Sequence, residues 1–532
     1  MERFFNIAGP MIPEINYCID PLSRIDWDEI RMLIGNMRYF VIHAPRQTGK
    51  TSALFAMMRA LNESGEYDCA YANVEEAQVA RGEVEKGIPI ICEAVSSDLA
   101  MRLNRPELLQ WYMDIGKRFE PQRQLNQLLK YWSSSSKKSV VLFIDEVDSL
   151  VGDTLISLLR QIRAGYPYRP GDFPQSIVLC GVRDVRDYRM RREDDEIITG
   201  GSAFNIKTKS LRMENFTYNE VEELWKQHTL ETGQEFDESI FPVLWEDTYG
   251  QPWLVNALGN QITVESVPNR DRRRKITLSD YKEAREVLIQ SRATHLDQLA
   301  DKLKEPRVFN VINKILLSDE SSIHASSDDI EYVADLGLIR TRPYIQISNR
   351  IYQEIIPREL TWTTQVTIAN QNQKWYVTTE HLLDMQKLIA AFQQFYREHS
   401  DVWKEGFSYK EAAPQLLLQA FLQRIVNGGG IITREYGLGR KRTDLYIEWP
   451  LDDTLGARGP LQRIVIEIKL RKGAFVKLLA DGLEQVSEYA EIVGADEAHL
   501  LIFDNSLEKT WDEKIWHRDE RIRNRLITIW GV

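Results

Sequence analysis

The sequence Tyr39-Phe40-Val41-Ile42-His43-Ala44-Pro45-Arg46-Gln47-Thr48-Gly49-Lys50-Thr51 decides the fold of the first half of the chain. Its first five residues predict a buried strand, and the stretch Ser52–Met58 that follows favours a helix. A loop between such a strand and helix turns its backbone N–H groups inward and binds phosphate at the positive end of the helix. The predicted phosphate-binding residues are Ala44, Pro45, Arg46, Gln47, Thr48, Gly49, Lys50 and Thr51.

Three positions of this loop carry distinct chemistry. Lys50 is expected to reach the outer phosphates of ATP, and Thr51 is expected to bind their Mg²⁺. Gly49 lies where the backbone must approach phosphate closely, which a Cβ would hinder. Ala44 stands where such loops usually begin with glycine, and a small residue is tolerated there. The loop therefore predicts ATP and Mg²⁺ as cofactors.

A second motif supplies carboxylates. The run Val140–Ile144 predicts another buried strand, and Asp145 and Glu146 follow at its end. Sheets of α/β proteins bind ligands at the carboxyl ends of their strands. Asp145 is expected to hold the magnesium through water, and Glu146 to polarise the attacking water. Two alternatives remain open: the two motifs meet by chance, or Glu146 is oriented unproductively and ATP binds without hydrolysis.

The remaining chain up to Leu258 alternates apolar runs with helical patterns, which predicts a parallel sheet covered on both faces. The further runs are Cys69–Val74 and Ile177–Cys180. Beyond Pro306, two helical patterns are followed by the alternating stretch Tyr344–Ile347, the order of a winged-helix module. The predicted fold class is α/β, with helical and winged-helix modules after the sheet.

Residues 1 to about 360 resemble the bacterial AAA-like, STAND-type ATPases. The resemblance is carried by Ala44–Thr51, Asp145-Glu146, Gly181–Asp184 and Gly250–Trp253. It implies that Arg183 senses the terminal phosphate, that Pro252 packs on the nucleotide, and that the winged helix acts as a lever more often than as a DNA reader. Two alternatives remain. Arg183 is an ordinary ion-pair partner on the surface, or Arg160 or Arg163 serves as an arginine finger in trans, in the ATP site of a neighbouring copy of the chain.

The C-terminal region holds a second constellation on the strand pattern Arg463–Leu470. Alternation places Glu467 and Lys469 on one face, away from the apolar side chains between them. Asp444 begins a neighbouring strand, so two carboxylates are expected to share Mg²⁺, with the Ile468 carbonyl as a third ligand. Lys469 is expected to orient or deprotonate the water that attacks a phosphodiester.

This constellation resembles the PD-(D/E)XK nuclease superfamily, with Asp444, Glu467 and Lys469 on its signature positions. Gln485, one turn before Tyr489, resembles the extra motif of its RecB-like branch. The resemblance implies a restriction-endonuclease-like domain with a flexible basic loop at 437–443 beside its site. The superfamily usually has a glutamate on the helix before the first strand. The plausible positions here carry Gln415 and Gln419, with Glu411 one turn earlier, which leaves the metal count open. The alternative is a solvated strand edge with an ordinary ion pair.

These motifs divide the 532 residues into five predicted regions. They are a P-loop ATPase core at 1–215, a helical lid at 216–300, a winged-helix domain at 301–360, a linker with a helical segment at 361–404, and a nuclease-like domain at 405–532.

Bulk properties limit the partners. The net charge of −12 argues against coating nucleic acid by bulk electrostatics, although a local groove can still bind DNA. Four cysteines without C-x-x-C pairing indicate a reducing cytoplasm. We expect no signal peptide and no membrane span. A homo-oligomer is allowed by this composition.

The interpretation that these motifs favour is an ATPase whose nucleotide state controls a Mg²⁺-dependent DNA nuclease, with defence against foreign DNA suggested by analogy. One alternative is a nucleotide-driven interaction switch whose nuclease-like module only binds a partner. The other is a DNA-processing motor.

Overall fold

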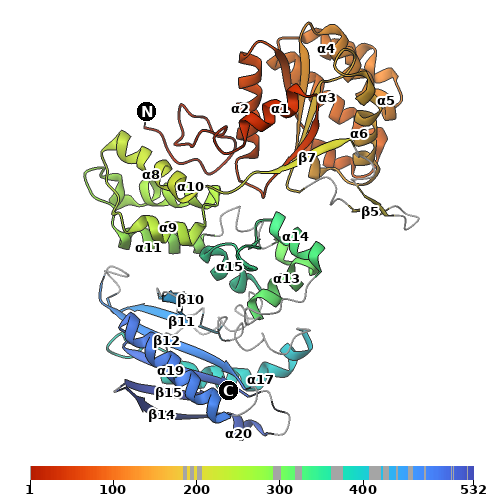
Figure 1. Cartoon of the computed structure of the whole chain (residues 1–532). Coiled ribbons are helices and arrows are strands. Elements are labelled where there is room, and N and C mark those ends of the chain that lie inside the picture. Colours follow the sequence, from red (N-terminus) through yellow and green to blue (C-terminus); the bar gives the residue numbers. More distant parts are fainter. Residues whose placement is uncertain are drawn as a thin grey trace. The chain divides into compact units, whose positions relative to one another are not determined.

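The computed structural model describes most of the chain as two compact units, one of Met1–Lys275 with Ile330–Ile339 and one of Ile276–Asp329 with Arg340–Val532 (Figure 1). The described residues are 2–183, 189–191, 197–199, 206–291, 301–317, 326–360, 375–406, 418, 421–422, 430–438, 441–452, 459–471, 475–504, 506, 509–523 and 525–532. Within these, the side chains of 189–191, 197–199, 313, 316–317, 357–360, 398–406, 433–438 and 441–444 are not described.

The first unit is built on a five-stranded sheet in the order β2-β3-β4-β1-β7. Its strands are β1 (Tyr39–His43), β2 (Tyr67–Asn73), β3 (Ser139–Asp145), β4 (Ser176–Gly181) and β7 (Lys207–Arg212). Every neighbouring pair is parallel. The predicted α/β class with a parallel sheet is confirmed, and the four apolar runs form the four strands β1 to β4.

Helices cover both faces of this sheet (Figure 1). They are α1 (Trp27–Gly35) and α2 (Lys50–Glu63) on one face, and α3 (Val84–Arg102), α4 (Pro106–Asp114), α5 (Pro121–Ser135) and α6 (Gly152–Gly165) on the other. Tyr39 and Val41 belong to one core, while Phe40 and Ile42 belong to the other. Because both faces are buried, the strand is apolar from Tyr39 to Ile42 rather than at alternate positions only.

The fifth strand was not predicted. Strand β7 reads Lys-Thr-Lys-Ser-Leu-Arg, which gives no apolar run. It lies at the edge of the sheet and pairs only with β1, so polar side chains can reach water there. A small hairpin of β5 (Arg189–Arg191) and β6 (Ile197–Thr199) precedes it and also escaped prediction.

The expected helices after the sheet are present as α8 (Tyr218–Thr232), α9 (Ile240–Thr248) and α10 (Pro252–Asn260). Thr217 and Glu220 form a capping box that starts α8. Gly250, at φ +69°, leads into α10, and a Cβ there would lie 1.9 Å from the Phe216 carbonyl oxygen. Only glycine fits this approach, so the Gly250–Pro252 turn has a structural reason of its own.

The winged-helix pattern gives the predicted order of elements, followed by a helix that was not predicted. The elements are α13 (Pro306–Leu317), α14 (Ser327–Asp335), β8 (Ile339–Arg340), β9 (Gln346–Ile347) and the unpredicted α15 (Arg350–Leu360). Helix α11 (Leu278–Gln290) comes before this pattern. Strands β8 and β9 form a separate two-stranded sheet.

The second unit contains a six-stranded mixed sheet in the order β10-β11-β12-β13-β15-β14. Its elements are α17 (Met385–Gly406), β10 (Ile431–Leu438), β11 (Lys441–Pro450), β12 (Leu461–Leu470), α19 (Phe475–Val493), β13 (Glu497–Phe503), α20 (Trp511–Lys514), β14 (Trp516–Ile522) and β15 (Arg525–Gly531). Strands β11 and β12 are antiparallel, whereas β12 and β13 are parallel and joined through α19. Helices α17 and α19 pack on opposite faces.

One expectation for this region is wrong. The segment 437–443 was predicted to be a flexible basic loop, but Gly437 pairs with Arg442 and Leu438 with Lys441. Gly437, which suggested flexibility, lies instead within β10, in its antiparallel pairing with β11. Backbone pairing in the ladder outweighs the local turn signal here.

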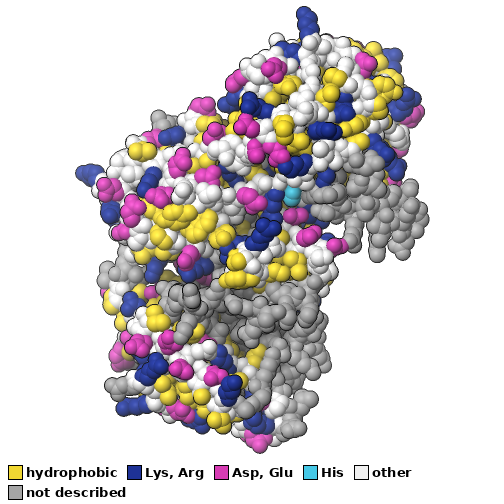
Figure 2. Space-filling model, viewed as in Figure 1, with side chains coloured by type: hydrophobic (Ala, Val, Ile, Leu, Met, Phe, Trp, Pro, Cys, Tyr) yellow, Lys and Arg dark blue, Asp and Glu magenta, His cyan; other side chains and the backbone are white. Residues whose placement is uncertain are grey.

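No helix among the described residues is long and apolar enough to cross a bilayer. On the face shown in Figure 2, basic and acidic side chains are interspersed over the described surface.

Candidate functional site

The phosphate-binding loop connects β1 to α2 as the sequence predicts. Gly49 is the N-cap of α2, in the left-handed region at φ +91°. A Cβ on Gly49 would lie 2.9 Å from Nη1 of Arg24, so this position excludes a side chain by both backbone conformation and space. The loop therefore ends at a helix N-terminus whose N–H groups are available to an anion.

Lys50 is held inside the loop. Its side chain is buried, and Nζ donates hydrogen bonds to the carbonyls of Ala44 (3.1 Å) and Pro45 (3.0 Å). The Thr48 hydroxyl donates to the same Pro45 carbonyl at 2.7 Å. These bonds curl the loop around the ammonium group, which places a positive charge where the phosphates of a nucleotide would lie.

Strand β3 brings the predicted magnesium residues together. The Thr51 hydroxyl donates to Oδ2 of Asp145 at 2.7 Å, and the Tyr71 hydroxyl donates to the same oxygen at 3.1 Å. Asp145 is fully buried. Tyr71 was not predicted, because β2 carries no motif that marks it.

This donor set fits Mg²⁺. A hydroxyl and a carboxylate are hard oxygen ligands, and Mg²⁺ usually completes its shell with water and substrate phosphates rather than with many protein groups. The described part of the chain contains no cluster of three or more His, Cys, Asp or Glu side chains that could hold a metal ion. Thr51 and Asp145 would hold the ion, which would supply charge neutralisation to the phosphates.

Glu146 has an unusual backbone and a perturbed carboxyl group. It adopts φ +57° and ψ +37°, the left-handed region that non-glycine residues rarely enter, and such residues gather at functional sites. Burial raises the pKa of its carboxyl, and Asp148 and Asp145 raise it further, while Lys50 and Arg46 oppose this. A carboxylate with a raised pKa is a better proton acceptor, as its predicted role requires.

Arg183 leaves the sheet beside the loop. Gly181, at the end of β4, is the register partner of His43 at the end of β1, and Arg183 follows two residues later. Its guanidinium lies 4.7 Å from the centre of the Tyr332 ring, within the same unit. The role of phosphate sensor stays a prediction. Arg160 and Arg163 are exposed on α6, where their proposed role as a finger also stays untested.

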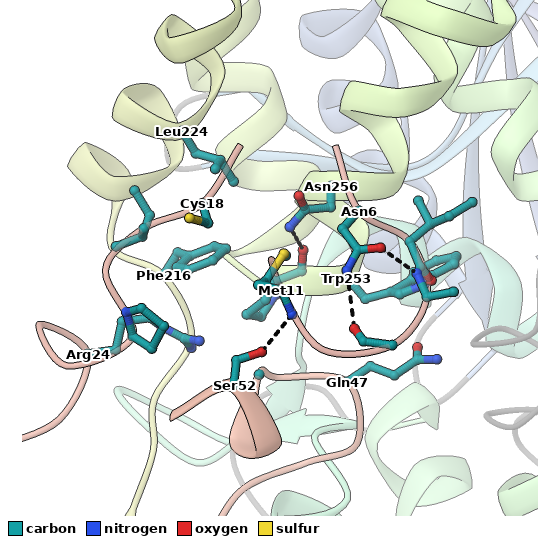
Figure 3. Close-up of a pocket in the computed structure, with 17 residues that line it drawn as sticks. Asn6, Met11, Cys18, Arg24, Gln47, Ser52, Phe216, Leu224, Trp253 and Asn256 are labelled. Carbon is teal, nitrogen blue, oxygen red and sulfur yellow. Dashed lines mark hydrogen bonds between the residues drawn. The ribbon is translucent and has the colours of Figure 1, made fainter. Parts of the chain in front are cut away.

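A pocket lies directly against the loop (Figure 3). Its walls include the loop residues Gln47 and Gly49, the predicted Pro252, and the apolar side chains of Phe216 and Leu224. Its interior of about 110 Å³ is several times what a single water occupies. A flat apolar group attached to phosphates in the loop therefore has a place beside it.

The N-terminal segment and Arg24 complete this pocket, and sequence reasoning missed both. The Trp253 indole N–H donates to the Ile7 carbonyl at 3.0 Å, and the Met11 N–H donates to the Ser52 hydroxyl at 2.9 Å (Figure 3). These bonds fix residues from the start of the chain over the loop and α10. No local motif marks them, because only tertiary packing brings them to the site.

Arg24 braces the loop from outside. Its Nη1 donates to the Thr48 carbonyl at 2.6 Å and its Nη2 to the Glu214 carbonyl at 2.8 Å. The guanidinium lies 4.5 Å from the centre of the Phe216 ring. Burial lowers its pKa to about 10, so Arg24 remains charged at neutral pH. It ties the loop to the segment that follows the edge strand β7.

Asn256 points its amide into the pocket with one atom unsatisfied (Figure 3). The amide nitrogen donates to the Pro252 carbonyl at 2.8 Å, which fixes the orientation of the group. Its Oδ1 is buried and has no hydrogen-bond partner among the described residues, and the same holds for Oε1 of Gln47. A buried acceptor left unpaired is costly. A planar base with an exocyclic amine, such as adenine, would supply the missing donor.

The C-terminal constellation is partly described. Lys469 Nζ lies 2.8 Å from Oε1 of Glu467, which is buried on the α19 face of β12. Ile468 points into the core on the opposite face. On α19, a Cβ at Gly482 would lie 2.9 Å from Cδ1 of Leu500, so the glycine lets the helix pack closely on β13. The predicted pairing of Glu467 and Lys469 on one face is present.

The partner carboxylate is placed only by its backbone. Leu445 pairs with Ile466 in the antiparallel β11–β12 ladder. Extending this register by one residue places the backbone of Asp444 across from that of Glu467. The side chain of Asp444 lies outside the described residues, as do Glu411, Gln415 and Gln419. Gln485 is half-buried on α19, and its Oε1 has no hydrogen-bond partner in the described part of the chain. Tyr489 is buried in the core between α19 and the sheet.

No family model matches the chain, and no curated protein matches it. Among solved structures, the chain is similar to the Walker-type ATPase PABY2304 of Pyrococcus abyssi, at 15% identity over 66% of this chain and 99% of that one, with a TM-score of 0.46. It is also similar to Cdc6p from Pyrobaculum aerophilum, at 15% identity over 63% and 93% of the two chains, with a TM-score of 0.35. The RuvB branch migration motor of Thermotoga maritima matches at 12% identity over 62% and 95%, with a TM-score of 0.33.

Proposed function

We propose that the first unit binds ATP with Mg²⁺ and hydrolyses it. One observation carries the proposal: Lys50 is enclosed by its own loop while Thr51 and Asp145 meet at 2.7 Å beside it. Charge for the phosphates and oxygen ligands for a magnesium ion thus converge at one end of the sheet. The pocket bounded by Pro252 and Asn256 supports a purine as the remaining part of the ligand.

In this proposal each residue has one task. Lys50 neutralises the outer phosphates, and the loop N–H groups orient them. Asp145 and Thr51 hold the magnesium, which neutralises charge as it develops on the phosphates. Glu146, with its raised carboxyl pKa, accepts a proton from the attacking water.

Equilibrium binding of a fluorescent ATP analogue tests the site. Lys50→Ala and Asp145→Asn should each weaken binding by about tenfold or more, because each removes a charged contact worth about 1.5–3 kcal/mol. Lys86→Ala is the matched control, since Lys86 lies exposed on α3 and pairs with Glu83. Equal affinity for all four proteins would refute the site.

We also propose that the second unit is a Mg²⁺-dependent DNA nuclease governed by the nucleotide state of the first. The observation that favours it is the contact of Lys469 with Glu467 on β12. The neighbouring strand β11 carries Asp444 across from Glu467. The unsatisfied Oε1 of Gln485 on the helix over this face supports a ligand there. The five predicted regions, an oligomeric assembly and a role in defence belong to the same proposal.

Plasmid cleavage with Mg²⁺, run with ATP, with ADP and without nucleotide, separates this from its alternatives. The nuclease requires cleavage that Lys469→Ala abolishes while the melting profile stays intact. If the wild type cleaves no plasmid with ATP, with ADP or without nucleotide, the result would favour an interaction switch. ATP turnover stimulated by DNA without cleavage would instead indicate a DNA-processing motor.

A further inference from the structure

A second pocket, unconnected with the ATP site, lies in the second unit at the carboxyl ends of β12 and β13. Eight described residues line it: Arg471, Phe475, Ile502, Asp504, Lys509, Lys514, Trp516 and Arg518. Its interior measures about 280 Å³, far more than a single water needs. The carboxyl ends of parallel strands are the usual place for ligands in α/β sheets.

The pocket adjoins the Glu467–Lys469 pair on the same face of the sheet. Lys469 is the register partner of Ile502, which lines the pocket and belongs to the core under α19. Arg471 follows Lys469 by two residues and also lines it. A ligand in the pocket would therefore lie next to the proposed cleavage site, one step further toward the edge of the sheet.

Positive charge exceeds negative charge among the described residues of this pocket. Arg471 and Lys509 share one carboxylate, that of Asp504, at 2.5 Å and 3.0 Å. Burial alone would raise the pKa of Asp504, but hydrogen bonds from Lys509, Ser506 and Arg471 hold it well below its usual range, so it stays ionised. Lys514 adds a cation that is only 8% exposed. The lining thus contains four cationic side chains and one carboxylate, which favours an anionic ligand.

Aromatic rings form part of the wall. The Trp516 and Phe475 rings meet edge to face with centroids 6.2 Å apart, and the guanidinium of Arg518 lies 5.6 Å from the Trp516 ring centre. A Cβ at Gly531 would lie 2.2 Å from the Trp516 indole nitrogen, so glycine lets the indole lie against β15. A flat base can stack on such rings while cations hold the adjoining phosphate.

We propose that this pocket binds a phosphate of a nucleic-acid strand and so positions the strand across Glu467 and Lys469. The inference rests on the proposed nuclease function for its biological purpose. The binding itself needs neither cleavage nor ATP. The phosphate is either a strand end or an internal phosphate, and both present the same chemistry to the pocket.

The test is fluorescence anisotropy of a labelled single-stranded DNA oligonucleotide with the full chain, in EDTA and without nucleotide. Arg518→Ala and Lys509→Ala are suitable variants, because both side chains are partly exposed and their removal leaves the core intact. Each should weaken binding by about tenfold and lower the dependence of log Kd on log salt by about one. Arg518→Lys should recover part of the loss.

Arg463→Ala is the matched control, because Arg463 is an exposed arginine on β12, towards its start. It should bind as the wild type does. Tighter binding of a 5′-phosphorylated strand than of its 5′-hydroxyl form would identify a strand end, and equal binding an internal phosphate. The proposal is overturned if Arg518→Ala and Lys509→Ala bind like the control. Normal binding without any cleavage would instead count against the nuclease alone.

Discussion

Replacing Arg24 by alanine should destabilise the first unit and loosen its phosphate loop. The guanidinium holds the carbonyls of Thr48 and Glu214 at 2.6 Å and 2.8 Å. Hydrogen bonds from a charged donor contribute about 1.5–3 kcal/mol each, and the one to Glu214 is solvent-exposed and counts for less. The free energy of unfolding should therefore fall by roughly 2–4 kcal/mol.

Differential scanning calorimetry of the full chain measures this effect. Since 1 kcal/mol shifts the Tm of a large domain by about 2–4 °C, the transition assigned to the first unit should fall by roughly 4–16 °C. That transition is the one that ATP with Mg²⁺ raises in the wild type, as a ligand that binds only the folded state must. Arg24→Lys should restore little, because a lysine lacks the planar fork whose two nitrogens reach the separate carbonyls of Thr48 and Glu214.

Arg31→Ala provides the comparison. Arg31 lies exposed on α1 and pairs with Asp28 three residues away, a contact that contributes little. Its Tm should stay within about 2 °C of the wild type. If the Tm of Arg24→Ala equals that of Arg31→Ala, then Arg24 does not stabilise the loop and this reasoning fails.

Three further predictions concern the two sites. Asn256→Leu should remove the acceptor aimed into the pocket and reduce the preference for ATP over nucleotides without an exocyclic amine by about tenfold in competition binding; an unchanged preference would refute the base contact. Because the pKa of Glu146 is raised, ATP turnover should fall on the acid side at a higher pH than for an ordinary glutamate, and Glu146→Gln should abolish turnover at every pH. A raised pKa also means that ionisation of Glu146 costs stability as pH rises, so Glu146→Gln should raise the Tm at neutral pH; a lower Tm would contradict this. Lys469→Met should remove Mg²⁺-dependent cleavage, and retained cleavage would exclude Lys469 from the chemistry.

Local pattern was sufficient for the parts of the fold where burial is uniform. The central strands β1, β3 and β4 each contain a continuous apolar run because helices cover both faces, and these runs mark the strands in the sequence. Edge strand β7 has no such constraint, so its Lys-Thr-Lys start gave no signal. The sequence favoured a loop at 437–443 because Gly437 and Gly439 are residue types common in turns. In the structure, Gly437 and Leu438 pair with Arg442 and Lys441 instead.

The candidate ATP site divides in the same way. Lys50, Thr51 and Asp145 were predictable because each lies in a short local motif, directly after a buried strand, whose residue types bind phosphate or magnesium. Arg24, Tyr71 and Asn256 carry no motif, and each reaches the site through contacts between elements far apart in the sequence. Such residues follow from tertiary packing, which no single stretch of sequence encodes.

Phosphate release from ATP by the purified chain is the most direct test of the central claim, the assembly of an ATP-hydrolysing centre from Lys50, Thr51, Asp145 and Glu146. We predict Mg²⁺-dependent release by the wild type, loss of ATP binding in Lys50→Ala, and retained binding without release in Glu146→Gln. Release that continues unchanged in Lys50→Ala, or a wild type that neither binds nor hydrolyses ATP, would contradict the account.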